Sequence, residues 1–454
     1  MTVIAFEGAA GTGKTWNLMA ALEAAVAAHP LLEGQKVLAL TFMHGSRRRL
    51  QERLTSMAIL GGRFECSTFD NLAWRLCHRW RRFARMRGRS FDPAGDFEST
   101  CDFAGWLLGH PEVRSWLRTG YPFVLVDEAQ DLSLPRFSMV KAIAVDGGLF
   151  LAADEFQCLD TDLHDNPTIR WLRESVAVNG LTAVRRTDMA GLLDAARCLR
   201  QGKAVPLQGD GFKLAEATGV GLMAWEVTSA LAWKARRRET VAIITPAKSG
   251  GVVDKVIEHV RTRQMGKVKK IGPFDIRWEA TAESSFDKAM QGVILPERGC
   301  HQVMARALAA AADQPAVAQT LGWLGRLAAL GAGNDLTGEN VRRQVRGANA
   351  ALSRLRSGRS SVKALAMTVQ QAKNREFDGV IVLWPYQVPV LEEHRRRMLY
   401  NAITRAKKWC VVVVQADGKK ERLLEPPFNI APAMLTEFRA KARRGVGAKT
   451  AKGR

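Results

Sequence analysis

The residues at positions 8–15 have the types and spacing of a loop that binds phosphate. They read Gly-Ala-Ala-Gly-Thr-Gly-Lys-Thr and follow an apolar, strand-like run at 3–6. In such a turn, backbone N–H groups point at phosphate, the lysine reaches the β and γ phosphates, and the threonine hydroxyl binds Mg²⁺. The alternative is a chance glycine-rich turn, which does not explain the Lys-Thr pair. We therefore expect a nucleoside triphosphate to be bound by Gly8, Ala9, Ala10, Gly11, Thr12, Gly13, Lys14 and Thr15.

Two adjacent acids follow a second apolar run. Residues 123–126 read Phe-Val-Leu-Val and continue into Asp127-Glu128-Ala-Gln-Asp131. Carboxylates at the end of a strand can hold Mg²⁺ and polarise an attacking water. We expect Asp127, together with Thr15, to hold the metal and Glu128 to polarise the water. Such acids could instead cap a helix, but their position downstream of the phosphate-binding loop favours catalysis.

The elements that must position these residues are visible as apolar runs. They lie at 37–41, 123–126, 149–152, 241–245, 380–383 and 410–414, and they alternate with helix-like stretches. Continuous apolar runs are typical of parallel strands buried on both faces. The sequence therefore predicts an α/β fold that binds ligands beyond the carboxyl ends of its strands. Because strand-like runs continue to residue 414, we expect a second α/β unit.

Two stretches interrupt this alternation. Residues 74–121 are helix-like, with tryptophans and arginines crowded between Trp74 and Arg89. Such a cluster suits a groove that stacks bases and binds phosphates, but an amphipathic helix with Trp74 and Trp80 in a core explains it about equally well. In the stretch 251–361, which includes Lys267, Lys269 and Lys270, a solvated basic face is at least as good an interpretation as a binding surface.

Charge and composition limit the class of protein. The 454 residues are 47% hydrophobic and 25% charged, which is ordinary for a globular protein of two or three domains. The net charge of +22 and the pI near 10.1 favour nucleic acid as the partner, although a generally basic composition is the alternative. The basic tail at 426–454 is expected to be disordered.

The cysteine spacing and the hydropathy argue against a zinc-binding, secreted or membrane-spanning protein. The seven cysteines are scattered without a Cys-x-x-Cys pair, so we expect reduced thiols and no zinc site. No apolar run approaches the roughly 20 residues of a membrane span, and the first strand leaves no room for a secretory signal. These features predict a cytoplasmic protein without membrane contact.

Several motifs in order resemble the UvrD/Rep type of superfamily 1 helicases. The segment Asp127-Glu-Ala-Gln-Asp131 after this P-loop is similar to the family's motif II. The resemblance covers residues 1 to roughly 415, and its interruptions fall where the family inserts its 1B and 2B subdomains. The other similar segments are 37–42 (motif Ia), 67–72 (the Thr-Phe-His segment), 149–157 (motif III), 181–187 (motif IV), 368–378 (motif V) and 400–407 (motif VI).

The resemblance implies two RecA-like P-loop domains with parallel sheets, each carrying a mainly helical insertion. Residues 1–73 and 122–178 would form domain 1A, and residues 179–250 and 362–425 domain 2A. The short 1B-like insertion would be 74–121, and the reduced 2B-like insertion 251–361. ATP and Mg²⁺ would bind between the two domains.

The resemblance also assigns roles to residues. Lys14, Asp127, Glu128 and Gln157 would act on ATP from one domain, and Arg186 and Arg405 from the other. Glu376 would contact the ribose. Arg185 is an alternative to Arg186, which we favour because it keeps the register with Thr187. The residues expected to touch nucleic acid are Thr41, Phe42, Thr68, Phe69, Thr368 and Gln370.

The resemblance implies an ATP-dependent 3′–5′ DNA helicase or translocase. It would act on single-stranded DNA and duplex junctions, with a possible protein loading partner. The alternative is an ATP-switched nucleic-acid-binding subunit of a larger repair, replication or defence complex. Only seven residues precede Gly8, so the family's upstream glutamine segment, which reads adenine, is missing. The chain is therefore expected to accept several nucleoside triphosphates.

Overall fold

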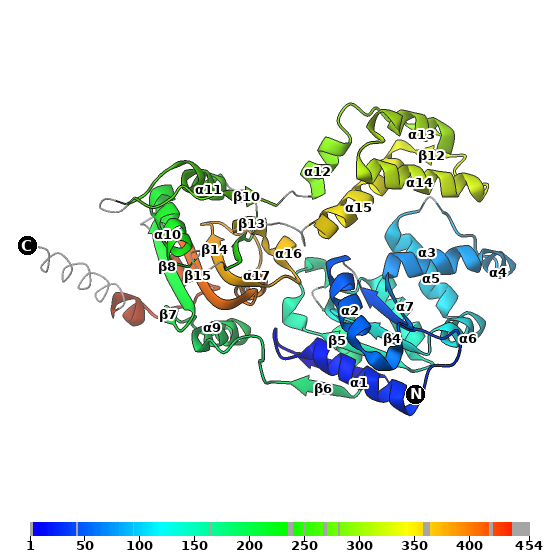
Figure 1. Ribbon diagram of the computed structural model, residues 1–454, viewed down its shortest axis with the longest axis horizontal. Coiled ribbons are helices and arrows are strands. Elements are labelled where there is room, and N and C mark those ends of the chain that lie inside the picture. The colour runs from blue at the N-terminus through cyan, green and yellow to red at the C-terminus, as the bar shows by residue number, and fades with distance from the viewer. Residues whose placement is uncertain are drawn as a thin grey trace, which may run out of the picture.

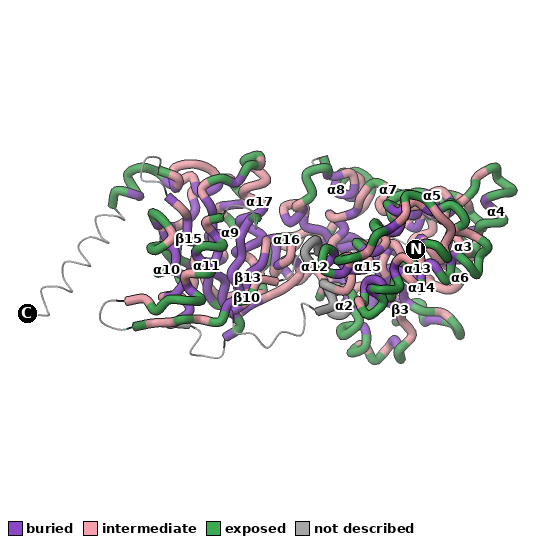
Figure 2. Tube along the Cα trace, turned by 90° about the horizontal axis from the view of Figure 1, so that it is seen from above, coloured by how far each residue is buried: buried purple, intermediate pink, exposed green. Residues whose placement is uncertain are grey.

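The computed structural model describes residues 3–41, 44–93, 95–163, 165–234, 239–247, 251–266, 270–279, 282–356, 364–416 and 421–437. These residues form two α/β lobes side by side and a cap of helices above the first lobe (Figure 1). Seen from above, the cap helices lie over the first lobe and leave the second uncovered (Figure 2). The expected α/β class is confirmed, with one parallel and one mixed sheet.

The first lobe is built on a parallel six-stranded sheet in the order β3-β2-β4-β5-β1-β6. All residues of β2, β4 and β5 are buried, as their continuous apolar runs predicted. Because the strands are parallel, the segments that follow β1, β4 and β5 meet at one edge. The strands are β1 (Ile4–Gly8), β2 (Val37–Thr41), β3 (Phe64–Thr68), β4 (Phe123–Val126), β5 (Leu149–Ala153) and β6 (Val178–Leu181).

Helices cover both faces of this sheet with separate hydrophobic clusters. The helices expected to form a 1B-like insertion share one of these clusters, because Cys77, Cys101 and Leu107 are buried with the residues of β4 and β5. This insertion therefore has no separate core within the described residues. The helices are α1 (Lys14–Ala28), α2 (His44–Ser56), α3 (Phe69–Arg79), α4 (Arg81–Met86), α5 (Phe97–Leu108), α6 (Pro111–Gly120), α7 (Leu134–Ala144) and α8 (Pro167–Ser175).

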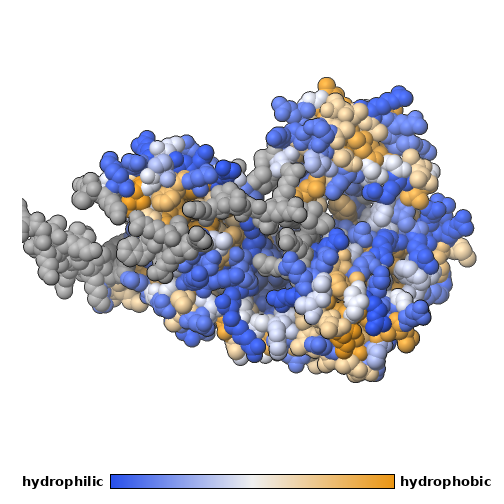
Figure 3. Space-filling view, viewed as in Figure 1, coloured by the Kyte–Doolittle hydropathy of each residue, from blue (hydrophilic) through white to orange (hydrophobic). Residues whose placement is uncertain are grey.

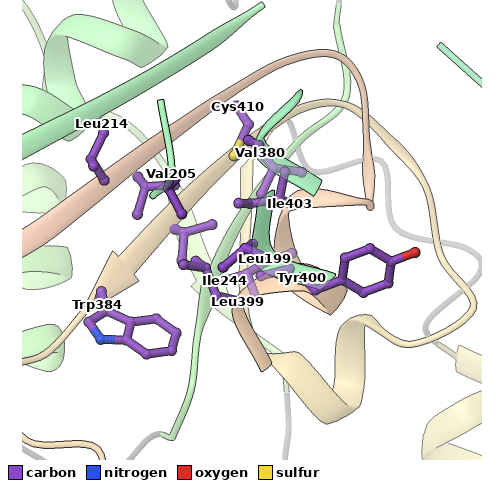
Figure 4. Packing of buried hydrophobic residues seen from close by; sticks show 14 of the residues in the cluster. Leu199, Val205, Leu214, Ile244, Val380, Trp384, Leu399, Tyr400, Ile403 and Cys410 are labelled. Carbon is purple, nitrogen blue, oxygen red and sulfur yellow. The ribbon is translucent and has the colours of Figure 1, made fainter. Parts of the chain in front are cut away.

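The second lobe has a seven-stranded sheet in the order β10-β13-β9-β14-β15-β8-β7, parallel except for the β7–β8 pair. Figure 4 shows Trp384, Leu399 and Ile403 packed in the cluster on one face. The strands are β7 (Gln208–Gly209), β8 (Phe212–Thr218), β9 (Val241–Thr245), β10 (Ile276–Trp278), β13 (Ala364–Thr368), β14 (Phe377–Trp384) and β15 (Ala406–Ala416). The helices are α9 (Ala190–Gln201), α10 (Gly219–Lys234), α11 (Val252–Thr262), α16 (Val369–Ala372) and α17 (Glu392–Ile403).

The cap has its own core. Buried residues such as Met304, Trp323 and Val341 form a separate cluster, and Trp74 of α3 packs against it. The helical cap thereby contacts the first lobe. Its elements are α12 (Ala282–Ala289), β11 (Arg298–Gly299), α13 (His301–Leu308), α14 (Pro315–Ala329), β12 (Leu336–Thr337) and α15 (Gly338–Arg356).

Two expected boundaries differ from the pairing of the strands. The expected division at residue 178 is wrong, because β6 pairs with β1 and belongs to the first sheet. The expected 2B-like insertion at 251–361 begins too early. Helix α11 packs in the core of the second sheet and β10 pairs with β13, so residues 252–266 and 270–278 belong to the second lobe. The positions Lys267 and Lys269 lie outside the described residues.

The expectation of disorder from residue 426 is also wrong for its first part. Phe428, Ile430 and Leu435 are buried in the core of the second lobe, because these apolar side chains precede the strongly basic end of the tail. Residues 438–454 lie outside the described ranges. The seven cysteines are free, and five of them are buried. None of the helices in the described ranges has the length and hydrophobicity of a membrane span.

The second sheet contains a glycine that we expect to be indispensable for its packing. A Cβ atom at Gly379 in β14 would lie 2.1 Å from the ring of Trp409. That ring is buried and donates to Glu239 Oε2 over 2.8 Å. Gly379→Ala should therefore lower the free energy of unfolding by ~2 kcal/mol or more, measured by urea denaturation. Gly180→Ala in β6, where a Cβ meets nothing within 4 Å, is the control and should change the free energy much less.

Candidate active site between the two lobes

The loop between β1 and α1 has the backbone of a phosphate cradle. Gly11 and Gly13 have φ angles of +80° and +83°, a region that favours glycine. Within the described part of the chain, no side chain caps the N-terminus of α1, so its first N–H groups are free to bind a phosphate. Lys14 Nζ lies over the loop and donates to the carbonyls of Gly8 and Ala9 at 2.9 and 3.1 Å.

A hydroxyl and a carboxylate meet beside this loop. Thr15 Oγ1 donates to Asp127 Oδ2 over 3.1 Å. Both are oxygen donors of the kind that Mg²⁺ takes when phosphates complete its coordination, so the donor set fits this ion. Burial and the charge of Glu128 raise the pKa of Asp127 to about 6. No cluster of three or more His, Cys, Asp or Glu residues suited to a metal occurs among the described residues.

Glu128 is held in an unusual backbone conformation. Its φ angle is +59°, which is uncommon for a non-glycine residue and is found at functional sites. Gln130 Nε2 donates to Glu128 Oε2 over 2.6 Å. Burial opposes ionisation of Glu128, but the charges of Lys14 and Lys373 outweigh it and lower the pKa. The carboxylate is therefore ionised at neutral pH and able to accept a proton.

Two arginines approach the loop from the other side. Arg405 is 2% exposed, and its Nε donates to the carbonyl of Asn401 over 2.9 Å. Burial and the charge of Arg186 lower the pKa of Arg405 to about 10, so the guanidinium stays protonated at neutral pH. Arg186 donates to the carbonyl of Thr404 over 3.0 Å and pairs with Glu376 over 3.1 Å.

These groups surround one cavity of about 310 Å³, within the size range of small-ligand sites. Glu376 and Arg405 belong to the second lobe, and Lys14, Asp127 and Glu128 to the first. The structure therefore brings together the residues expected to act on the nucleotide. The predicted residues that line the cavity are Gly11, Gly13, Lys14, Thr15, Asp127, Glu128, Gln157, Arg186, Glu376 and Arg405.

Comparisons with known proteins agree with this geometry. Residues 1–161 match the family model of an AAA domain, and residues 363–413 match that of the UvrD-like helicase C-terminal domain. The first match contains the loop at 8–15 and the acids at 127–128, and the second contains Glu376 and Arg405. The two matches support a UvrD/Rep-like helicase. No curated protein matches the chain.

Beside the phosphate-binding loop lies a buried ionic network that sequence reasoning missed. Asp154 is 0% exposed and pairs with Arg200 over 2.6 Å and with Lys14 over 3.8 Å. Tyr400 Oη accepts from the N–H of Ala10 over 2.8 Å and from Arg200 over 3.3 Å. The second lobe thus contacts the loop directly, because Arg200 and Tyr400 come from α9 and α17.

The cavity is also lined by Trp16, which the sequence analysis left without a role, and by Arg185, which it named as an alternative to Arg186. Trp16 is 58% exposed, and the guanidinium carbon of Arg185 lies 5.4 Å from the centre of its ring. An exposed ring beside a guanidinium plane can stack on a nucleotide base regardless of its identity. The backbone N–H of Arg185 donates to the carbonyl of Gly11 over 2.7 Å, so Arg185 lies against the phosphate-binding loop.

This arrangement predicts a stacking contact with the base. Trp16→Ala should raise KM for ATP roughly tenfold with little change in kcat, because aromatic stacking stabilises bound ground state and transition state alike. Trp16→Phe, which keeps a ring, should stay near the wild-type value. The same shift is expected with GTP, and steady-state kinetics with both nucleotides measure it. An unchanged KM in Trp16→Ala would contradict the contact.

A second, larger cavity of about 1190 Å³ lies between both lobes and the cap, and a hollow is visible beneath the cap in Figure 3. Of the residues expected to touch nucleic acid, Thr41, Thr68, Phe69 and Gln370 line it. Thr368 instead accepts from the N–H of Gln371 and caps α16. Phe42 lies outside the described residues.

The surroundings of the residues that line this cavity limit their roles. Phe69 is 1% exposed and packs in the core of the first lobe, so it shapes the wall and offers little surface for stacking. Thr68 caps α3 by accepting from the N–H of Asn71. Lys373 Nζ pairs with Asp131 over 2.6 Å across the two lobes. This buried pair lines the large cavity. The positive charge of Lys373 also lowers the pKa of Glu128.

Proposed function

We propose that the chain is an ATP-dependent 3′–5′ DNA helicase or translocase that couples ATP hydrolysis to movement along single-stranded DNA. The observation that carries the proposal is the cavity whose walls come from both lobes, with Lys14 and Glu128 on one side and Arg405 on the other. Its family, a net charge of +22 and the large cavity across both lobes support it. The polarity is proposed from the resemblance to the family.

The proposed hydrolysis assigns a separate task to each residue. Lys14 and the loop N–H groups bind the phosphates, and Thr15 and Asp127 hold Mg²⁺, which supplies charge neutralisation when bound. Glu128 orients the attacking water and accepts its proton. Gln157, which lines the same cavity, would detect the γ phosphate. Arg186 and Arg405 stabilise the charge on the transferred phosphoryl group, so hydrolysis proceeds when the lobes are closed.

The proposed coupling runs between the two cavities. Thr41 and Thr68 from the first lobe and Gln370 and Lys373 from the second line the large cavity, so a strand bound there contacts both lobes. Lys373 pairs with Asp131, three residues from Glu128. Opening and closing of the lobes would therefore change the strand contacts and the charge around Glu128 together.

Strand displacement on tailed duplexes tests the proposal. The purified chain should unwind a duplex with a 3′ single-stranded tail in the presence of ATP and Mg²⁺, and not one with a 5′ tail. Lys14→Ala is the control and should be inactive. Unwinding from the 5′ tail alone would reject the polarity. Hydrolysis stimulated by DNA without any displacement would instead favour an ATP-switched binding subunit.

A further inference from the structure

A third cavity lies between the first lobe and the cap. It has a volume of about 670 Å³ and separates α3 and α4 from α14. We call it the arginine groove, and its polar and aromatic lining residues are Trp74, His78, Arg79, Arg81, Arg82 and Arg326. Neither the nucleotide site nor the proposed strand path across the two lobes accounts for it.

The charge of the arginine groove is not neutralised by the described protein. No acidic residue of the described ranges lines it, and no ion pair with a described carboxylate is formed by Arg79, Arg81, Arg82 or Arg326. Arg79 instead stacks on Trp116 at 4.5 Å. Four guanidinium groups from two facing walls therefore favour an extended polyanion.

The groove also presents aromatic rings. The ring centres of Trp74 and His78 lie 4.0 Å apart, and both rings form T-shaped contacts with Phe91. Neither ring nitrogen of His78 has a hydrogen-bond partner in the described structure. Rings and guanidinium planes bind unpaired bases by stacking, whereas the bases of a duplex already stack on one another. The chemistry of the groove therefore favours a single strand over a duplex.

The groove adjoins the large cavity, because Trp74 and Arg326 line both. Elsewhere the cap and the first lobe touch: Arg343 lies 3.6 Å from Asp96, and the backbone of Gly347 approaches the ring of Phe97. We propose that the arginine groove is a second subsite for single-stranded nucleic acid, which holds the part of the strand that leaves the large cavity. This inference rests on the proposed function.

Arg82 and Arg85 provide a matched pair for the test. Both are exposed arginines of α4, but only Arg82 lines the groove. Binding of fluorescent oligothymidylates from about 4 to about 16 nucleotides would be measured for wild type, Arg82→Glu and Arg85→Glu at several salt concentrations. Thermal unfolding would check that each variant folds.

We expect Arg82→Glu to bind the longest oligothymidylates about fivefold more weakly and the shortest ones like wild type. The salt dependence for long strands should fall by about 0.7 in the slope of log K against log salt, the value for one lost phosphate contact. Arg85→Glu should bind like wild type at every length.

Three results would overturn the subsite. They are equal binding of long strands by Arg82→Glu and wild type, equal losses in both variants, and a loss that appears only with duplex DNA. If wild type binds no oligonucleotide of any length, the proposed function fails together with the subsite. If wild type binds and only the length-dependent loss is missing, the subsite fails alone.

Discussion

Glu128→Gln should lower kcat for ATP hydrolysis about 10³-fold while the protein still binds ATP. The amide keeps the size of the side chain but cannot accept a proton from water. The groups that hold the phosphates, Lys14 and the loop N–H groups, are unchanged. A coupled assay for phosphate release measures kcat, and titration with a fluorescent ATP analogue measures binding.

Two further variants make this result specific. Lys14→Ala should lose both ATP binding and hydrolysis, because the positively charged lysine forms charge-assisted hydrogen bonds with the bound phosphates. Glu155→Gln should retain activity, since Glu155 pairs with Arg173 over 2.9 Å and does not line the nucleotide cavity. If Glu128→Gln kept more than a tenth of the wild-type kcat, another residue would have to position the water.

Arg405→Ala should lower kcat about 10³-fold, the effect typical of an arginine that stabilises charge on a transferred phosphoryl group. Arg405→Lys should recover part of the loss, because it keeps the charge but not the planar fork. Steady-state kinetics and nucleotide binding, measured on both variants, separate the effect on kcat from the effect on affinity.

The control for Arg405 is Arg395→Lys. Arg395 lies on α17, and its Nε donates to the carbonyl of Val390 outside the nucleotide cavity, so this variant should hydrolyse ATP like wild type. Weaker nucleotide binding with an unchanged kcat in Arg405→Ala would mean that Arg405 acts on bound ATP and not on the transition state.

The sequence predicted the central strands well because of where they lie. Strands β2, β4 and β9 begin and end where their apolar runs do. Parallel strands that are buried on both faces carry apolar residues at nearly every position, so the run of apolar residues marks the whole strand. The edge strands β6 and β10 read Val-Asn-Gly-Leu and Ile-Arg-Trp. They carry exposed polar residues and gave no such run, so both boundaries that depend on them were misplaced.

The same contrast applies to the site. Lys14, Asp127 and Glu128 could be identified because their local motifs place them directly after strands. The pairs Arg200–Asp154 and Lys373–Asp131 join residues 46 and 242 positions apart. Neither pair has a local pattern, and Arg200 lies in a helix without any motif. Only the packing of one lobe on the other brings these charges together.

The most direct test of the account is the rate of ATP hydrolysis by the purified chain with and without single-stranded DNA, with duplex DNA and RNA as competing stimulants. We predict a rate that rises with single-stranded DNA and then saturates, and that stays at background in Lys14→Ala. Equal rates with and without single-stranded DNA would contradict the claim that a strand across both lobes controls a nucleotide site shared between them.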